Sequence, residues 1–159
     1  MGGAQALHPH RAAAALSVAI AAIAALAAGC GGAGEALSRD QYVARLNAMC
    51  EDFAAREKQI GEPESAEDLA ESGPQILEAF EHSIVEKVHD LEPPSEIAAQ
   101  ANRLVEIADR QRDVLSGLVD AAQRNDLARI PELLSRNRAL NAEAGSIARD
   151  LGADACAAR

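Results

Sequence analysis

Four side chains that could bind a metal ion recur along one predicted helix: Glu78, His82, Glu86 and His89. Their steps of four, four and three residues place them on one helical face. Glu86 and His89 form a Glu-x-x-His unit, which di-iron helical bundles combine with a second such unit on another helix. The chain has no second unit, because His82 and His89 are the only histidines after residue 29. We therefore expect a solvated polar face with no cofactor, and a zinc or copper site as the alternative.

The apolar residues of the same segment support the solvated interpretation. Phe80, Ile84 and Val88 each lie two positions after a member of the Glu78, His82 and Glu86 series. Two positions correspond to about 200° around a helix. If these apolar side chains pack into a core, the Glu and His side chains face water.

A different chemistry is indicated at Cys30, which follows an uncharged, mostly alanine run over residues 12–28. Arg11 precedes this run, and a positive charge before an apolar run is typical of secretory signals. The alternative is a retained membrane span, because 17 residues are just long enough to cross a bilayer. The segment ending Ala27-Ala28-Gly29-Cys30 resembles the lipobox of bacterial lipoproteins. This resemblance implies that 1–29 is a removed signal peptide and that Cys30 carries the lipid. It also implies attachment to the cell membrane at its extracytoplasmic face.

The composition after residue 29 limits the partners of the chain. It holds 14 Lys and Arg side chains against 25 Asp and Glu, so the net side-chain charge is −11. Nucleic acid and anionic lipid surfaces both require clustered positive charge, so we expect no nucleic-acid partner and no flat adsorption on the membrane. The expected partners are the membrane, through the lipid anchor, and an unknown protein of the cell envelope.

Helical periodicity extends over most of the remaining chain. It predicts helices from Ser38 to Ile60, from Pro74 to the Pro93-Pro94 pair, from Ser95 to Arg124, and from about Pro131 to Leu151. The acidic segment 61–73 is either a loop or the first turns of the second helix, capped by Ser65 and kinked at Gly73-Pro74.

These elements predict an all-α fold, an antiparallel four-helix bundle over 38–159, joined to Cys30 by a flexible tether over 30–37. The alternative is a three-helix core with a long, kinked second arm. The many alanines are expected to let the helices approach closely, with little room for a cofactor. Gln111 interrupts the apolar seam of the third helix, either at its edge, which we expect, or as a residue that fixes register.

Two further cysteines, Cys50 and Cys156, remain for an oxidising compartment. In an up-and-down bundle the fourth helix ends near the first helix, so we expect a disulfide bond between them. The alternative is a buried Cys50 and a free thiol in a short tail after Gly152.

The domain also resembles small uncharacterised exported helical proteins of actinobacteria. The resemblance depends on Leu91-Glu92-Pro93-Pro94 before a long helix, and on Leu151-Gly152 followed by Cys156 with an earlier helical cysteine. It implies a shared helical domain and no known activity.

No catalytic motif accompanies these features: Gly-x-Ser-x-Gly, His-Glu-x-x-His, a phosphate-binding glycine loop and Cys-x-x-Cys-His are all missing from the sequence. We therefore expect a non-enzymatic, membrane-anchored lipoprotein whose helical domain is an interaction or envelope-structural module. The alternative is an extracytoplasmic lipoprotein that binds or senses a metal or a small solute, which would require a ligand cavity between the helices.

Overall fold

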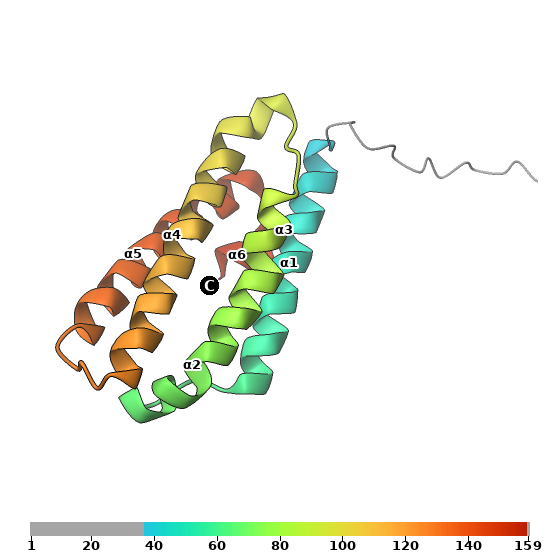
Figure 1. Cartoon of the computed structure of the whole chain (residues 1–159). Helices are drawn as coiled ribbons and strands as arrows, with labels where there is room; N and C mark the ends of the chain where they lie inside the picture. Colours follow the sequence, from blue (N-terminus) through green and yellow to red (C-terminus); the bar gives the residue numbers. More distant parts are fainter. Residues whose placement is uncertain (1–36, 159) are drawn as a thin grey trace, which may run out of the picture. The chain divides into compact units, whose positions relative to one another are not determined.

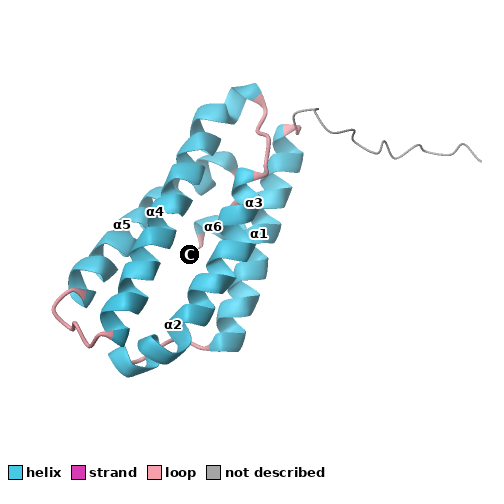
Figure 2. Ribbon diagram, viewed as in Figure 1, coloured by secondary structure: helices cyan, strands magenta, loops and turns pink. Residues whose placement is uncertain are grey.

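A computed structural model describes residues 37–158, and every regular element in that range is helical (Figures 1 and 2). The all-α class predicted from the sequence is confirmed for this range. The predicted signal peptide 1–29, Cys30 and the tether up to residue 36 lie outside the described residues. In chain order the elements are α1 (Arg39–Ile60), α2 (Ala66–Phe80), η1 (Glu81–Val85), α3 (Glu86–His89), η2 (Ser95–Ile97), α4 (Ala98–Gln123), α5 (Ile130–Leu151) and α6 (Asp154–Ala157).

The first helix begins and ends where its sequence predicts. Ser38 and Gln41 form a capping box, in which the Gln41 N–H donates to Ser38 Oγ and the Ser38 N–H donates to Gln41 Oε1. Gly61 ends the helix at a φ of +93°, a backbone conformation that residues with a Cβ rarely adopt. The buried stripe of α1 is Tyr42, Leu46, Met49 and Phe53.

The acidic segment after α1 contains both a loop and helical turns. Ser65 caps α2 by accepting a hydrogen bond from the Asp68 N–H, so the helix begins at Ala66. The helix then continues through Pro74, and Gly73 before it has no Cβ to collide with the proline ring. A Cβ on Gly73 would also lie only 2.8 Å from Cγ2 of Val119 on α4. The missing side chain therefore allows α2 and α4 to approach closely.

A π-helical turn, η1, interrupts the straight helix that the sequence predicts after Phe80. Its wider turn changes which side chains point inward, because more residues are needed to complete it than in an α-helix. Ser83 and Val85 are buried as a result, and Ile84, predicted to face the core, is only half-buried.

The last long helix has the predicted limits. Pro131 lies at its first turn, where its missing N–H costs nothing, and Gly152 ends it in the left-handed conformation. Two predictions for this region are wrong. The helical periodicity of residues 131–151 predicts that Leu134 faces the core beside Leu133, but Leu134 is 37 % exposed. The predicted tail is instead a short helix, α6, preceded by the fully buried Ala153.

The long helices pack in the order α1, α2, α4, α5. The short helix α6 packs on both α5 and α1, which hardly contact each other directly. The domain therefore has an edge along which its first and last long helices are joined mainly through α6.

Candidate functional site

The four predicted metal ligands do not share one site. His82 Nδ1 lies 2.9 Å from Oε2 of Glu86, and its Nε2 lies 3.9 Å from Oε1 of Glu78. His89 instead pairs with Asp109 on α4, with a distance of 3.0 Å between His89 Nε2 and Asp109 Oδ1. His89 therefore does not join His82 and the two glutamates in one ligand set, although all four side chains are exposed.

The surroundings of His82 are those of a solvated surface. Its side chain is 51 % exposed, and the hydrogen bond with Glu86 raises the pKa of the imidazole. Within residues 37–158 no group of three or more His, Cys, Asp or Glu side chains is arranged to hold a metal ion.

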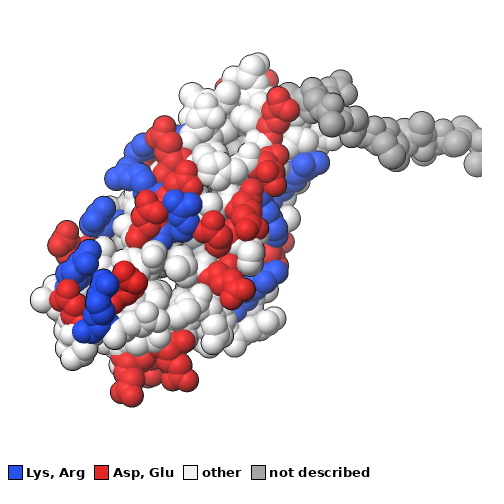
Figure 3. All heavy atoms as spheres, viewed as in Figure 1, with Lys and Arg blue, Asp and Glu red and all other residues white. Residues whose placement is uncertain are grey.

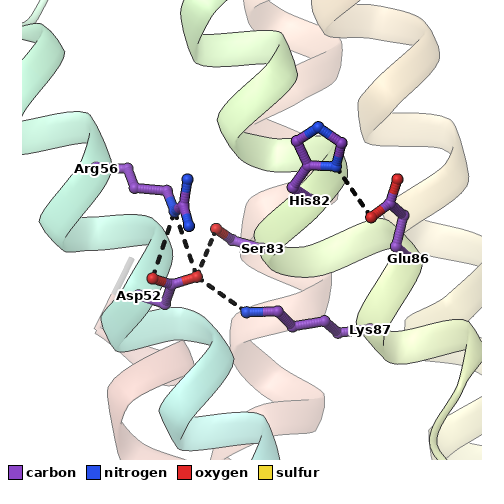
Figure 4. A network of polar contacts seen from close by, with 6 residues as sticks. All are labelled: Asp52, Arg56, His82, Ser83, Glu86 and Lys87. Atoms are coloured by element: carbon purple, nitrogen blue, oxygen red, sulfur yellow. Dashed lines mark hydrogen bonds and ion pairs between the residues drawn. The ribbon is translucent and has the colours of Figure 1, made fainter.

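A polar network joins α1 to the π-helical turn and α3 (Figure 4). Oδ2 of Asp52 accepts hydrogen bonds from Ser83 Oγ at 2.8 Å and from Lys87 Nζ at 2.9 Å. Arg56 Nε lies 3.4 Å from both carboxylate oxygens. The bonds from Lys87 and Ser83 lower the pKa of Asp52 to about 2.

This network has a structural role, although it contains a serine, a lysine and a carboxylate. Ser83 is fully buried, so an external substrate cannot reach its hydroxyl. One sign of its position is visible in the sequence: Ser83 is a hydroxyl residue beside the apolar stripe of Phe80 and Ile84. That sign could not be interpreted without knowledge of the π-helical turn.

A cavity of about 610 Å³ lies among the long helices and is the main candidate site. One stripe from each helical segment lines it, at the spacings of three and four residues that define a helical face. α6 contributes the remaining wall. The described lining residues are Leu46, Met49, Cys50, Glu51, Phe53, Ala54, Glu57, Ile76, Phe80, Ile84, Val88, Leu104, Ala108, Gln111, Leu115, Asn137, Asn141, Ala144, Ala148, Ala155, Cys156 and Ala158.

The alanines explain the cavity in part. They were expected to let the helices approach closely and leave little room, and around the cavity that expectation is wrong. Ala108, Ala144 and Ala148 line the space with short side chains, while α6 is inserted between α1 and α5 and packs on both. Small side chains on helices that cannot move together leave an empty volume.

A disulfide bond fixes α6 at the cavity wall. The sulfurs of Cys50 and Cys156 are 1.99 Å apart and the two Cα atoms are 5.2 Å apart, so the predicted pairing is confirmed and a free tail thiol is not present. The Ala155 N–H also donates a hydrogen bond to Oδ1 of Asn47 on α1, at 3.0 Å. Both cysteines border the cavity.

Three amide side chains gather on the α4 and α5 side of the cavity. Gln111 Nε2 donates a hydrogen bond to Oδ1 of Asn141, which links the two helices. Gln111, which was expected at the edge of its seam, is half-buried and pairs across the helix interface. Asn137, one turn before Asn141, has a buried Oδ1 without a hydrogen-bond partner. No other buried side-chain nitrogen or oxygen in the described residues has this status.

The charged side chains around the cavity are all carboxylates in the part of its lining that the structure describes. Glu51 and Glu57 of α1 border it, and no Lys, Arg or His belongs to that lining. The described lining also has no Ser, Thr or Tyr hydroxyl, and its two cysteines are bonded to each other. The described lining therefore presents apolar, amide and carboxylate groups.

A second, more open hollow of about 520 Å³ lies between α2 and α4 and is bordered by Glu78, His82 and Arg112. Arg112 pairs with Asp113 at 3.0 Å. Figure 3 shows acidic and basic side chains interspersed over the face that it presents. The described lining of the hollow itself holds four carboxylates, from Glu78, Glu81, Asp113 and Asp120, against the one guanidinium of Arg112, so it is acidic.

No helix within residues 37–158 has the length and apolarity needed to cross a membrane. No protein-family model, curated protein or solved structure matches the chain. The resemblances to lipoproteins and to exported actinobacterial proteins stay predictions, and the function has to be argued from the geometry of the domain.

Proposed function

We propose that the chain is an extracytoplasmic, lipid-anchored binding protein that holds an apolar small molecule in the cavity between α1 and α5. The observation that carries this proposal is the cavity itself: about 610 Å³, lined mainly by aliphatic and aromatic side chains. Small-molecule sites typically have volumes of about 300–1,000 Å³ and a mostly apolar lining. This function develops the small-solute alternative of the sequence analysis, and the proposed activity is non-enzymatic.

We also propose that the fold is an antiparallel four-helix bundle that is open along one edge. Three neighbouring helix pairs pack directly, whereas α6 separates the fourth pair, α1 and α5. Because α6 is bonded to α1 through the cysteines, the open edge is held at a fixed width. A preformed cavity avoids much of the ordering cost of binding.

The cell-membrane location and the anchor at Cys30 complete the proposal. The lipobox resemblance supports them, and the Cys50 to Cys156 bond agrees with an oxidising compartment. A ligand exchanged with the membrane or with an envelope protein would enter close to the headgroups, because the tether is short.

The proposal is tested by filling the cavity. Ala144→Trp places a large side chain in the lining, and Ala142→Trp, an exposed position on the same helix, is the matched control. The full chain of each variant is reconstituted in phosphatidylcholine nanodiscs and irradiated with a long-chain alkane that carries a diazirine. Mass spectrometry then locates the adducts.

We expect adducts on the cavity stripes of α1 and α4 in the unmodified chain and in Ala142→Trp, and their loss in Ala144→Trp. Circular dichroism checks that both variants are folded. Adducts that are spread over exposed positions, or that are equally abundant in the two tryptophan variants, would contradict binding in the cavity.

A further inference from the structure

The polar groups of the cavity are unevenly distributed. The stripes from α1 and α2 contribute aliphatic and aromatic side chains such as Met49, Phe53 and Phe80, together with two carboxylates. The amides of Gln111, Asn137 and Asn141 come from α4 and α5. A ligand that fills the cavity therefore meets an apolar wall on one side and amide groups on the other.

Asn137 is the amide that a ligand could satisfy. Gln111 and Asn141 are already bonded to each other, whereas Oδ1 of Asn137 is buried and has no partner. An unpartnered buried acceptor is rare in native proteins because it loses its hydrogen bonds to water and gains none in return. A small rotation of this side chain toward the cavity would let its oxygen accept a hydrogen bond from a ligand.

The charges of the lining determine which head group fits. Glu51 and Glu57 border the cavity, and the described lining offers no cation. A carboxylate or phosphate head group would lose its hydration there without gaining a positively charged partner. A hydroxyl or ammonium group can donate a hydrogen bond to Oδ1 of Asn137.

We propose that the ligand is an aliphatic amphiphile with a hydrogen-bond-donating head group that carries no negative charge, and that Asn137 accepts the hydrogen bond from that head group. This inference rests on the function proposed above and specifies the class of ligand. The aliphatic part of the ligand lies against α1, α2 and the first half of α4, where Leu104 and Ala108 line the cavity. The head group lies beside α5.

Competition between ligands of one chain length tests the inference. The full chain in phosphatidylcholine nanodiscs is labelled with the diazirine alkane, and four competitors are compared: an alkane, a primary alcohol, a primary ammonium and a carboxylate. Competitor concentrations are expressed per lipid, which corrects for unequal partitioning into the bilayer. We expect the alcohol and the ammonium to compete at concentrations at least about tenfold lower than the alkane and the carboxylate.

Two substitutions assign this preference to Asn137. Asn137→Leu removes the acceptor at similar volume and should reduce the advantage of the alcohol over the alkane to about onefold. Asn137→Asp should instead increase the advantage of the ammonium over the alcohol. Ser135→Leu, an exposed polar-to-leucine change on the same helix, is the matched control and should behave like the unmodified chain.

The outcomes separate the two proposals. If the carboxylate competes as well as the alcohol, or if the alcohol keeps its advantage in Asn137→Leu, the inference is overturned and the proposed function survives. If the diazirine alkane does not label the cavity at all, the proposed function fails and the inference fails with it.

Discussion

The Cys50 to Cys156 bond closes almost the whole described domain into one loop, and its removal should have a large and calculable effect. The two residues are 106 positions apart. In the chain-entropy model a loop of this length lowers the entropy of the unfolded chain enough to stabilise the fold by about 5 kcal/mol at 25 °C. This is a large share of the roughly 5–15 kcal/mol by which single domains are stable.

The perturbation is the double substitution of Cys50 and Cys156 by alanine. We expect the free energy of unfolding to fall by about 3–5 kcal/mol, because the contacts of α6, including the hydrogen bond from Ala155 to Asn47, can still form in the folded state. The dependence of this free energy on urea should also become steeper, since an unfolded chain without the cross-link exposes more surface.

Urea unfolding of the full chain in nanodiscs, followed by circular dichroism, measures both quantities. Adding a reductant to the unmodified chain should reproduce the double variant, and the double variant should not respond to reductant. Equal unfolding midpoints for the unmodified chain and the double variant would refute the argument that the bond restricts the unfolded chain.

Further predictions concern single positions and use the same urea assay. Asn137→Leu should stabilise the ligand-free domain by about 1–3 kcal/mol, because it removes an unpartnered buried acceptor, and a loss of stability would count against this interpretation. Gly73→Ala should destabilise the domain by about 1–2 kcal/mol despite its gain of about 1 kcal/mol in helix propensity, since the new Cβ has no space; a neutral result would show that α2 and α4 can move apart. The pKa of Asp52 is lowered to about 2, so the stability that its ion pair contributes is complete above the usual aspartate pKa of about 4 and is lost as pH falls through about 2. Asp52→Asn should remove this loss of stability in acid. If the pH dependence of the free energy of unfolding is the same in this variant, Asp52 is not its source. The pKa of His82 is raised, so the stability that its protonated form contributes is present below the usual histidine pKa of about 6.5 and is lost as pH rises through the raised value. His82→Gln should make the free energy of unfolding independent of pH in that range. A pH dependence retained in this variant would belong to another group.

Local sequence signals predicted the helix ends well, because these ends depend on neighbours in the chain. The capping box at Ser38, the cap at Ser65 and the left-handed Gly152 each act within one helical turn. The cysteine pairing was also predictable, since two thiols and an up-and-down order of helices leave few arrangements.

The candidate site depends on distances between helices, which periodicity does not encode. The sequence does not show that α6 lies between α1 and α5. Without that knowledge, the alanines predict that the helices pack closely. The π-helical turn could not be predicted for a related reason: its buried Ser83 is bonded to Asp52 on another helix, 31 residues earlier, and periodicity does not encode such a contact. The role of Asn137 could not be predicted, because an amide side chain on a helix is usually exposed and its burial depends on the neighbouring helices.

The position of α6 has a practical consequence for anyone who produces this protein. Ala158 follows α6 and borders the cavity, so an affinity tag fused after α6 leaves the domain beside that cavity. The turn at Asn125, exposed and with a positive φ, lies at the opposite end of α5 from α6. An epitope inserted there would allow purification and detection while leaving the α6 side of the cavity unobstructed.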